Sequence, residues 1–136
     1  MNLALFSAVF IIQFVGHRIG DYLLQTDVQA QNKATNAWAR FKHCFVYSFT
    51  IAALVGLILQ SLELYIIVFL ITIIEHMIID TRKPVLWFKR ILETKIARNK
   101  NYSPDKLPFF VLIEIDQTIH YTRILVISLL IGYGLI

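Results

Sequence analysis

Long apolar runs constrain the fold of this chain more than any other feature of its sequence. Four of them lie at residues 3–24, 37–59, 64–80 and 108–136. A helix needs ~20 residues to cross a ~30 Å hydrocarbon layer. Only 16% of the 136 residues are charged, whereas soluble domains carry about 25%. We therefore predict an all-α polytopic membrane protein, a single domain built as a four-helix transmembrane bundle.

The segments between the apolar runs predict how the helices connect. A very short turn near residues 60–63 predicts that the second and third runs form an antiparallel hairpin. After Pro84, residues 85–97 place apolar side chains on one side and charged side chains on the other, and Trp87 suits a headgroup boundary. This pattern is typical of an amphipathic helix lying on a membrane surface, here on the cytoplasmic side.

The charge pattern predicts the orientation of the bundle. The net charge is +4, but the basic residues flank apolar runs, so we attribute them to orientation and lipid headgroups and expect no nucleic acid partner. Basic residues gather after the first and third runs: Lys33, Arg40, Lys42, Arg82, Lys83, Lys89, Arg90, Lys95, Arg98, Lys100 and Lys106. The positive-inside rule places these segments in the cytoplasm and both termini outside.

Ionisable side chains occur inside the predicted spans, although each costs about 2.5–3.5 kcal/mol even on lenient insertion scales. Each predicted helix contains one of the 4 histidines. Histidine and aspartate stand four residues apart in three helices and therefore share a face. With a rise of ~1.5 Å per residue, seven side chains reach one layer below the cytoplasmic surface: His17, Asp21, His43, His76, Asp80, Asp116 and His120.

Imidazole and carboxylate together favour a first-row divalent metal, zinc first and iron or manganese next. Seven donors exceed the needs of one tetrahedral ion, so we predict either one or two ions, with some of the seven orienting the ligands. The structural alternatives are hydrogen-bonded packing histidines, a helix cap at Asp80, and ion pairs of Asp21 with Arg18 or of Asp116 with Arg123.

Other residues are weaker candidates. Glu75 adjoins His76 and, with Asp80, is a candidate catalytic residue. Arg18 and Arg123 are candidates for holding an anionic headgroup. Gln117 is a candidate for contacting a substrate or orienting a ligand, whereas the single Cys44 is expected to fill space.

The metal layer predicts a membrane-embedded, metal-dependent hydrolase acting on a lipid or lipid-linked phosphate or ester from the cytoplasmic leaflet. The main alternative is a metal-binding, transport or sensor protein without hydrolysis, although the apolar outer halves of spans two and four disfavour a pathway through the membrane. A redox enzyme with a di-iron centre is a third alternative, but membrane di-iron desaturases use more histidines, in HxxxH and HxxHH boxes, which are missing. A haem protein, a holin-like structural protein and a homo-oligomer that encloses the site with a second copy remain open.

Three motifs carry a family resemblance. GHRIGDYLLQTD at residues 16–27, EHMIID at 75–80 and DQTIH at 116–120, together with His43, resemble the domain of unknown function 3307 family. The resemblance covers essentially the whole chain and implies a small bacterial or phage-associated protein of the inner membrane. It implies no activity. A looser similarity to the inner-membrane metal-dependent hydrolases of the YdjM type favours hydrolysis by analogy only.

Overall fold

The computed structural model describes all 136 residues, and the chain contains helices and no β-strand. The predicted all-α class is therefore confirmed. The helices are α1 (Leu3–Arg18), α2 (Asp27–Asn32), α3 (Ala37–Ile58), α4 (Leu62–Ile79), α5 (Lys83–Ile91) and α6 (Phe109–Tyr133). One π-helical turn, Ile19–Leu23, extends α1, another, Leu92–Ile96, extends α5, and a short 3-10 turn covers Pro104–Lys106.

Polar side chains fix where the first four helices begin. Asn2, Asn36 and Ser61 each accept a hydrogen bond from a backbone N–H in the first turn of α1, α3 and α4. Thr26 does the same for α2, and Gln29 returns a bond to the Thr26 backbone, which completes a capping box. These caps set the start of each helix and hence the height at which its side chains meet the neighbouring helices.

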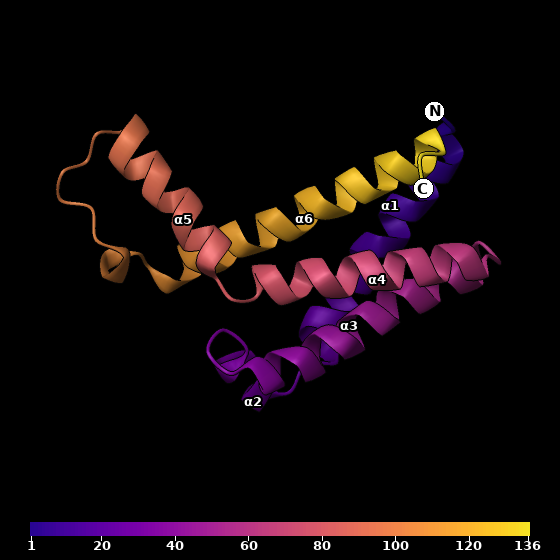
Figure 1. The fold of residues 1–136 in the computed structure, drawn as a ribbon, viewed down its shortest axis with the longest axis horizontal. Coiled ribbons are helices and arrows are strands. Elements are labelled where there is room, and N and C mark those ends of the chain that lie inside the picture. The colour runs from indigo at the N-terminus through magenta and orange to yellow at the C-terminus, as the bar shows by residue number, and fades with distance from the viewer.

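The helices reverse direction in turn, so that both termini lie at one end of the molecule (Figure 1). There the backbone N–H of Asn2 donates to the carbonyl of Gly132 at 2.7 Å. The α3–α4 turn lies at this same end, whereas α2 and α5 lie at the other (Figure 1). At that second end Gly20 lets α1 approach α3, because a Cβ on Gly20 would come within 2.9 Å of the Tyr47 ring.

Three helices are long and apolar enough to cross a membrane: Leu3–Leu23, Ala37–Ile58 and Leu62–Ile79. α6 is not among them, because Glu114, Asp116 and Arg123 interrupt its 25 residues. The expectation of four spans is thus met for three helices. The segment predicted as a surface helix, residues 85–97, is helical from Lys83 to Ile96 and projects away from α4 (Figure 1).

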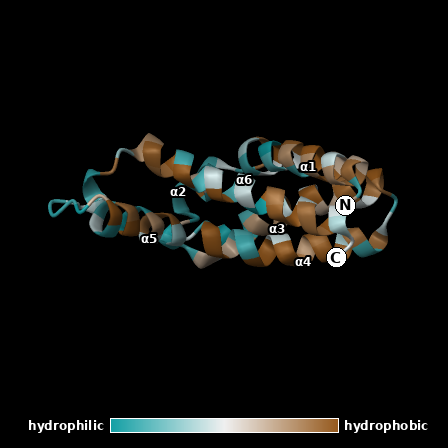
Figure 2. Ribbon diagram, turned by 90° about the horizontal axis from the view of Figure 1, so that it is seen from above, coloured by the Kyte–Doolittle hydropathy of each residue, from teal (hydrophilic) through white to brown (hydrophobic).

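Apolar side chains cover much of the outside of the molecule. Leu57 and Leu62 are 76% and 74% exposed, and apolar residues predominate at the end that carries the termini (Figure 2). The interior holds about as many polar as apolar buried side chains. An exterior of this kind suits hydrocarbon as the surrounding solvent and is compatible with an integral membrane protein.

Candidate metal centre

The four histidines, one from each of α1, α3, α4 and α6, meet inside the molecule. All four are at most 1% exposed. The His76 ring centroid lies 5.1 Å from that of His43 and 4.5 Å from that of His120, and the His17 centroid lies 5.4 Å from that of His120. The cluster is therefore built from four helices of one chain.

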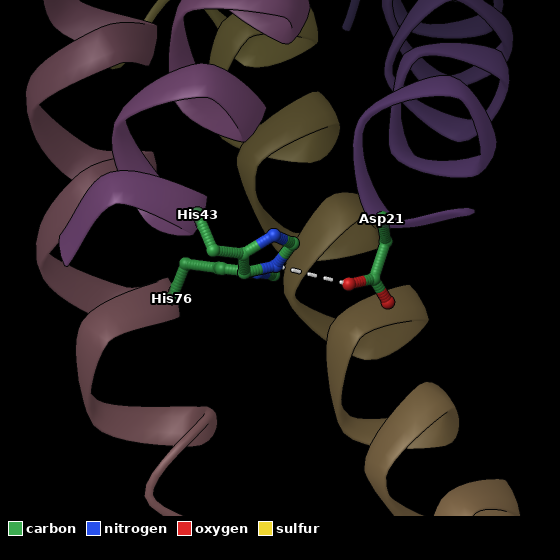
Figure 3. Close-up of side chains that lie close together, drawn as sticks. All are labelled: Asp21, His43 and His76. Atoms are coloured by element: carbon green, nitrogen blue, oxygen red, sulfur yellow. Dashed lines mark hydrogen bonds and ion pairs between the residues drawn. The ribbon is translucent and has the colours of Figure 1, made fainter. Parts of the chain in front are cut away.

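The first donor group consists of Asp21, His43 and His76. Their side chains point toward one another from three helical segments (Figure 3). The Nε2 atom of His43 lies 3.1 Å from Asp21 Oδ1 and 3.0 Å from His76 Nε2. One donor atom from each residue lies within 4.8 Å of the other two, which is close enough to share an ion.

Asp80, the C-terminal cap of α4, joins this group to a second one. Its Oδ2 atom lies 3.4 Å from His43 Nε2 and 3.3 Å from His76 Nε2. Its Oδ1 atom faces the other way, 3.6 Å from His120 Nε2. Asp116 Oδ2 lies 3.8 Å from the same nitrogen. Asp80, Asp116 and His120 therefore form a second donor group that shares the Asp80 carboxylate with the first.

Several buried oxygen and nitrogen atoms of the centre, each able to bind a metal, have no hydrogen-bond partner within the chain. They are Asp80 Oδ1, Asp116 Oδ1, His76 Nδ1 and both ring nitrogens of His120. Leaving a buried polar atom unpaired costs about 1–3 kcal/mol. Unpaired imidazole nitrogens and carboxylate oxygens that face each other are a donor set suited to zinc or a similar divalent ion. The residues present thus fit a metal.

Lys33 at the end of α2 completes the first group. Its Nζ atom lies 2.8 Å from Asp21 Oδ1, 3.3 Å from Asp80 Oδ2 and 3.2 Å from His43 Nε2. Burial disfavours the ammonium, but the carboxylates of Asp80 and Asp21 outweigh burial and raise the pKa of Lys33. The side chain is therefore a charged part of the centre, whereas its sequence position identified it only as a basic residue of a loop.

His17 belongs to a hydrogen-bond relay rather than to either donor group. Arg123 Nη2 donates to the Tyr47 hydroxyl at 2.6 Å, and that hydroxyl lies 2.7 Å from His17 Nδ1. His17 Nε2 lies 2.7 Å from Gln117 Oε1, and Gln117 Nε2 donates to Asp21 Oδ2 at 3.0 Å. Arginine can only donate. The relay therefore runs from Arg123 to Asp21 and leaves no free nitrogen on His17.

If the centre binds a metal, substitution of His17 by leucine is expected to leave the metal content of the purified protein unchanged. It should lower the free energy of unfolding by about 1–3 kcal/mol, because Tyr47 and Gln117 lose a buried partner. The matched change, His120→Leu, removes an unpaired nitrogen that faces Asp80 and should remove the metal. Elemental analysis and chemical unfolding of both purified variants measure these effects. Metal loss in His17→Leu together with metal retention in His120→Leu would contradict this assignment, because His17 rather than His120 would then be the ligand.

Two predicted site residues, Glu75 and Arg18, belong neither to the two donor groups nor to the relay. Glu75 Oε2 lies 3.6 Å from Arg123 Nε, and the Glu75 side chain, which is partly exposed, lines a groove formed by α4, α5 and α6. Arg18 is exposed and donates to the Tyr121 hydroxyl at 3.3 Å. Cys44 is buried, with Sγ 4.0 Å from Asp80 Oδ2, and it forms a further candidate group with His76 and Asp80.

The comparison with protein families places these residues in a family. A family model described as "Protein of unknown function (DUF3307)" matches residues 9–134. The chain belongs to this family. The resemblance inferred from the three sequence motifs is thereby confirmed, and every residue of the DUF3307 chain that contributes to the centre or the relay lies inside the matched region. No curated protein and no solved structure matches this DUF3307 chain.

The centre of this DUF3307 protein is reached from the end that carries α2. A pocket of about 140 Å³ there is lined by the carboxylates of Asp21, Asp80 and Asp116 and by the cationic side chains of Lys33 and Arg82. Gln117 also lines it. At the opposite end, an apolar cluster closes the space between the helices: Val9, Tyr47, Ile51, Ala52, Val55, Val68, Ile127 and Ile131. The centre is therefore open to polar molecules only from the end that carries α2.

Proposed function

We propose that this protein is a membrane-embedded, metal-dependent hydrolase that acts on a lipid or lipid-linked phosphate or ester. The observation that carries the proposal is the buried histidine and aspartate centre, whose carboxylates line a pocket at one end of the molecule. A bound divalent ion would supply a Lewis acid for a phosphoryl or acyl bond and would acidify a water molecule.

The proposed position in the membrane follows from charge. No lysine or arginine occurs in residues 1–17, 43–81 or 124–136. Basic residues instead surround α2, α5 and the ends of the helices that meet them. We propose that α1, α3, α4 and α6 cross a bacterial inner membrane together, with both termini outside and the pocket facing the cytoplasm. We propose that α6 is accommodated because Asp116, His120 and Arg123 are buried against the other helices, whereas the exposed Glu114 lies in the first two turns of α6.

The surface around the pocket suits an anionic headgroup. Arg82 places a positive charge beside the pocket, and α5 carries Trp87 and Phe88, at 65% and 45% exposure, on the same end of the molecule. We propose that α5 lies in the headgroup region of the cytoplasmic leaflet and borders the entry. Gln117 also lines the pocket, and we propose that its second amide N–H, the one that does not donate to Asp21, contacts a substrate oxygen.

Hydrolysis rather than transport is favoured by the closed end of the molecule. A transport path would need polar groups through the region that the apolar cluster around Ile51 and Val55 fills. A sensor or metal-storage role remains chemically compatible with the same ligands, and it predicts metal binding without turnover.

Purified protein in detergent micelles is expected to release phosphate or fatty acid in a metal-dependent reaction. The probes are dioleoyl phosphatidic acid and a short-chain phospholipid ester, with p-nitrophenyl phosphate as a soluble comparison. Chelation with EDTA should lower the rate at least about 100-fold, and added zinc, iron or manganese should restore it. Full metal occupancy without turnover on any lipid probe would favour the sensor or storage role, and absence of bound metal would remove the basis of the proposal.

A further inference from the structure

The two donor groups differ in whether they already contain a cation. In the first group, the ammonium of Lys33 contacts Asp21, His43 and the Oδ2 atom of Asp80. An ammonium has three N–H donors, of which two form hydrogen bonds with Asp21 and His43, and its charge also pairs with the Asp80 carboxylate. Lys33 therefore stands where a metal bound by Asp21 and His43 would have to lie.

The second group contains no such cation. No lysine or arginine forms an ion pair with Asp116 or with Oδ1 of Asp80. His120 Nε2, Asp80 Oδ1 and Asp116 Oδ1 are buried without partners, although Asp80 is 1% exposed and His120 is 0% exposed. An unpaired carboxylate in such surroundings needs a positive charge nearby.

The spacing of the second group also fits an ion rather than direct hydrogen bonds. His120 Nε2 lies 3.6 Å from Asp80 Oδ1 and 3.8 Å from Asp116 Oδ2, which is beyond the usual 2.7–3.2 Å of a hydrogen bond. Two ligands bound tetrahedrally to one zinc ion at ~2.0–2.2 Å are about 3.4 Å apart. The side chains are thus already spaced close to the separation that a shared ion requires.

Charge balance points to the same arrangement. Asp21, Asp80 and Asp116 bring three negative charges into the buried centre. One divalent ion and the ammonium of Lys33 neutralise them, whereas two divalent ions beside Lys33 would leave an excess of positive charge. Buried charges are tolerated only when they are paired.

We propose that the centre holds a single divalent ion, bound by Asp80, Asp116 and His120, and that the ammonium of Lys33 occupies the second cation position. Asp80 then bridges the ion and the ammonium through its two oxygens. This inference rests on the proposed function, because both require a bound metal. It adds that there is one ion, which residues bind it, and what Lys33 does.

Metal stoichiometry tests the proposal. The protein and its variants are purified in detergent, saturated with zinc, freed of excess metal and analysed for zinc per chain, with titration calorimetry as a second measurement. We expect one ion in the unaltered protein and two in Lys33→Ala, because removing the ammonium frees Asp21, His43 and His76. Lys33→Arg should retain one. The matched control is Lys42→Ala, a lysine of α3 near the Trp38 ring, which should also retain one.

A second pair of variants tests the place of the ion independently of Lys33, should Lys33→Ala fail to fold. His43→Ala should retain the ion, and Asp116→Asn should lose it. Two ions in the unaltered protein, or one ion in folded Lys33→Ala, would overturn the inference while leaving a metal-dependent function intact. Loss of the ion in His43→Ala with retention in Asp116→Asn would overturn it likewise. Absence of zinc from the unaltered protein would overturn the inference and the proposed function together.

Discussion

Asparagine in place of Asp80 is expected to reduce the metal content to below about a tenth of that of the unaltered protein. Asp80 is the one residue that contacts His43, His76, His120 and Lys33 together. The amide has no negative charge, and even changes to residues that only support a ligand commonly cost 10–100-fold in metal affinity. Elemental analysis after dialysis against a metal-buffered solution measures the loss.

Glu114→Gln provides the matched control for Asp80→Asn. It makes the same chemical change on an exposed side chain of α6, two residues before Asp116. Metal content should remain that of the unaltered protein. Equal metal contents in the two variants would show that buried carboxylate charge at Asp80 does not hold the ion, and the centre would then need a different explanation.

Phenylalanine in place of Tyr47 is expected to destabilise the fold by about 2–4 kcal/mol. The Tyr47 hydroxyl is the only group that joins Arg123 to His17, at 2.6 Å and 2.7 Å. Its removal leaves a buried guanidinium N–H and a buried imidazole nitrogen unpaired, and hydrogen bonds to charged groups contribute about 1.5–3 kcal/mol. The stacking of this ring on His76, at 3.7 Å between centroids, would remain. Chemical unfolding in mixed micelles, followed by circular dichroism, measures the change.

Tyr65→Phe is the control for the loss of a tyrosine hydroxyl. Tyr65 packs against the same apolar cluster, so the variant keeps the ring and changes only the hydroxyl. Its stability should differ from that of the unaltered protein by less than about 1 kcal/mol. A Tyr47→Phe variant as stable as Tyr65→Phe would mean that the relay contributes little to the fold.

Much of the centre can be predicted from the sequence, because the regular geometry of a helix determines which side chains share a face. The i,i+4 spacing of His76 with Asp80 and of Asp116 with His120 places each pair on one face, and the lengths of the apolar runs set the depth of each pair. The structure brings both pairs together with His43. Short-range periodicity was sufficient for these residues because each lies on a regular helix.

Lys33 could not be placed from the sequence because its position depends on the path of the chain between helices. The capping box at Thr26 and Gln29 starts a short helix that turns the chain back over the open end of the centre. Arg40 then donates to the Lys33 carbonyl at 2.8 Å and holds that turn. Nothing in the spacing of basic residues distinguishes a lysine that enters the centre from one that faces lipid headgroups.

The π-helical turn at the end of α1 determines the direction in which the Asp21 side chain points. Its characteristic hydrogen bond runs from the Leu24 N–H to the Ile19 carbonyl at 3.0 Å. Compared with an α-helix, the wider turn accommodates an additional residue and changes the angular phase of everything beyond it. This change separates His17, in the relay, from Asp21, beside Lys33. In an α-helix Asp21 would share a face with His17, four residues earlier, whereas the smaller rotation per residue of the π-helical turn gives Asp21 a different direction. The position of this carboxylate therefore depends on the local winding of the helix as well as on its chemistry.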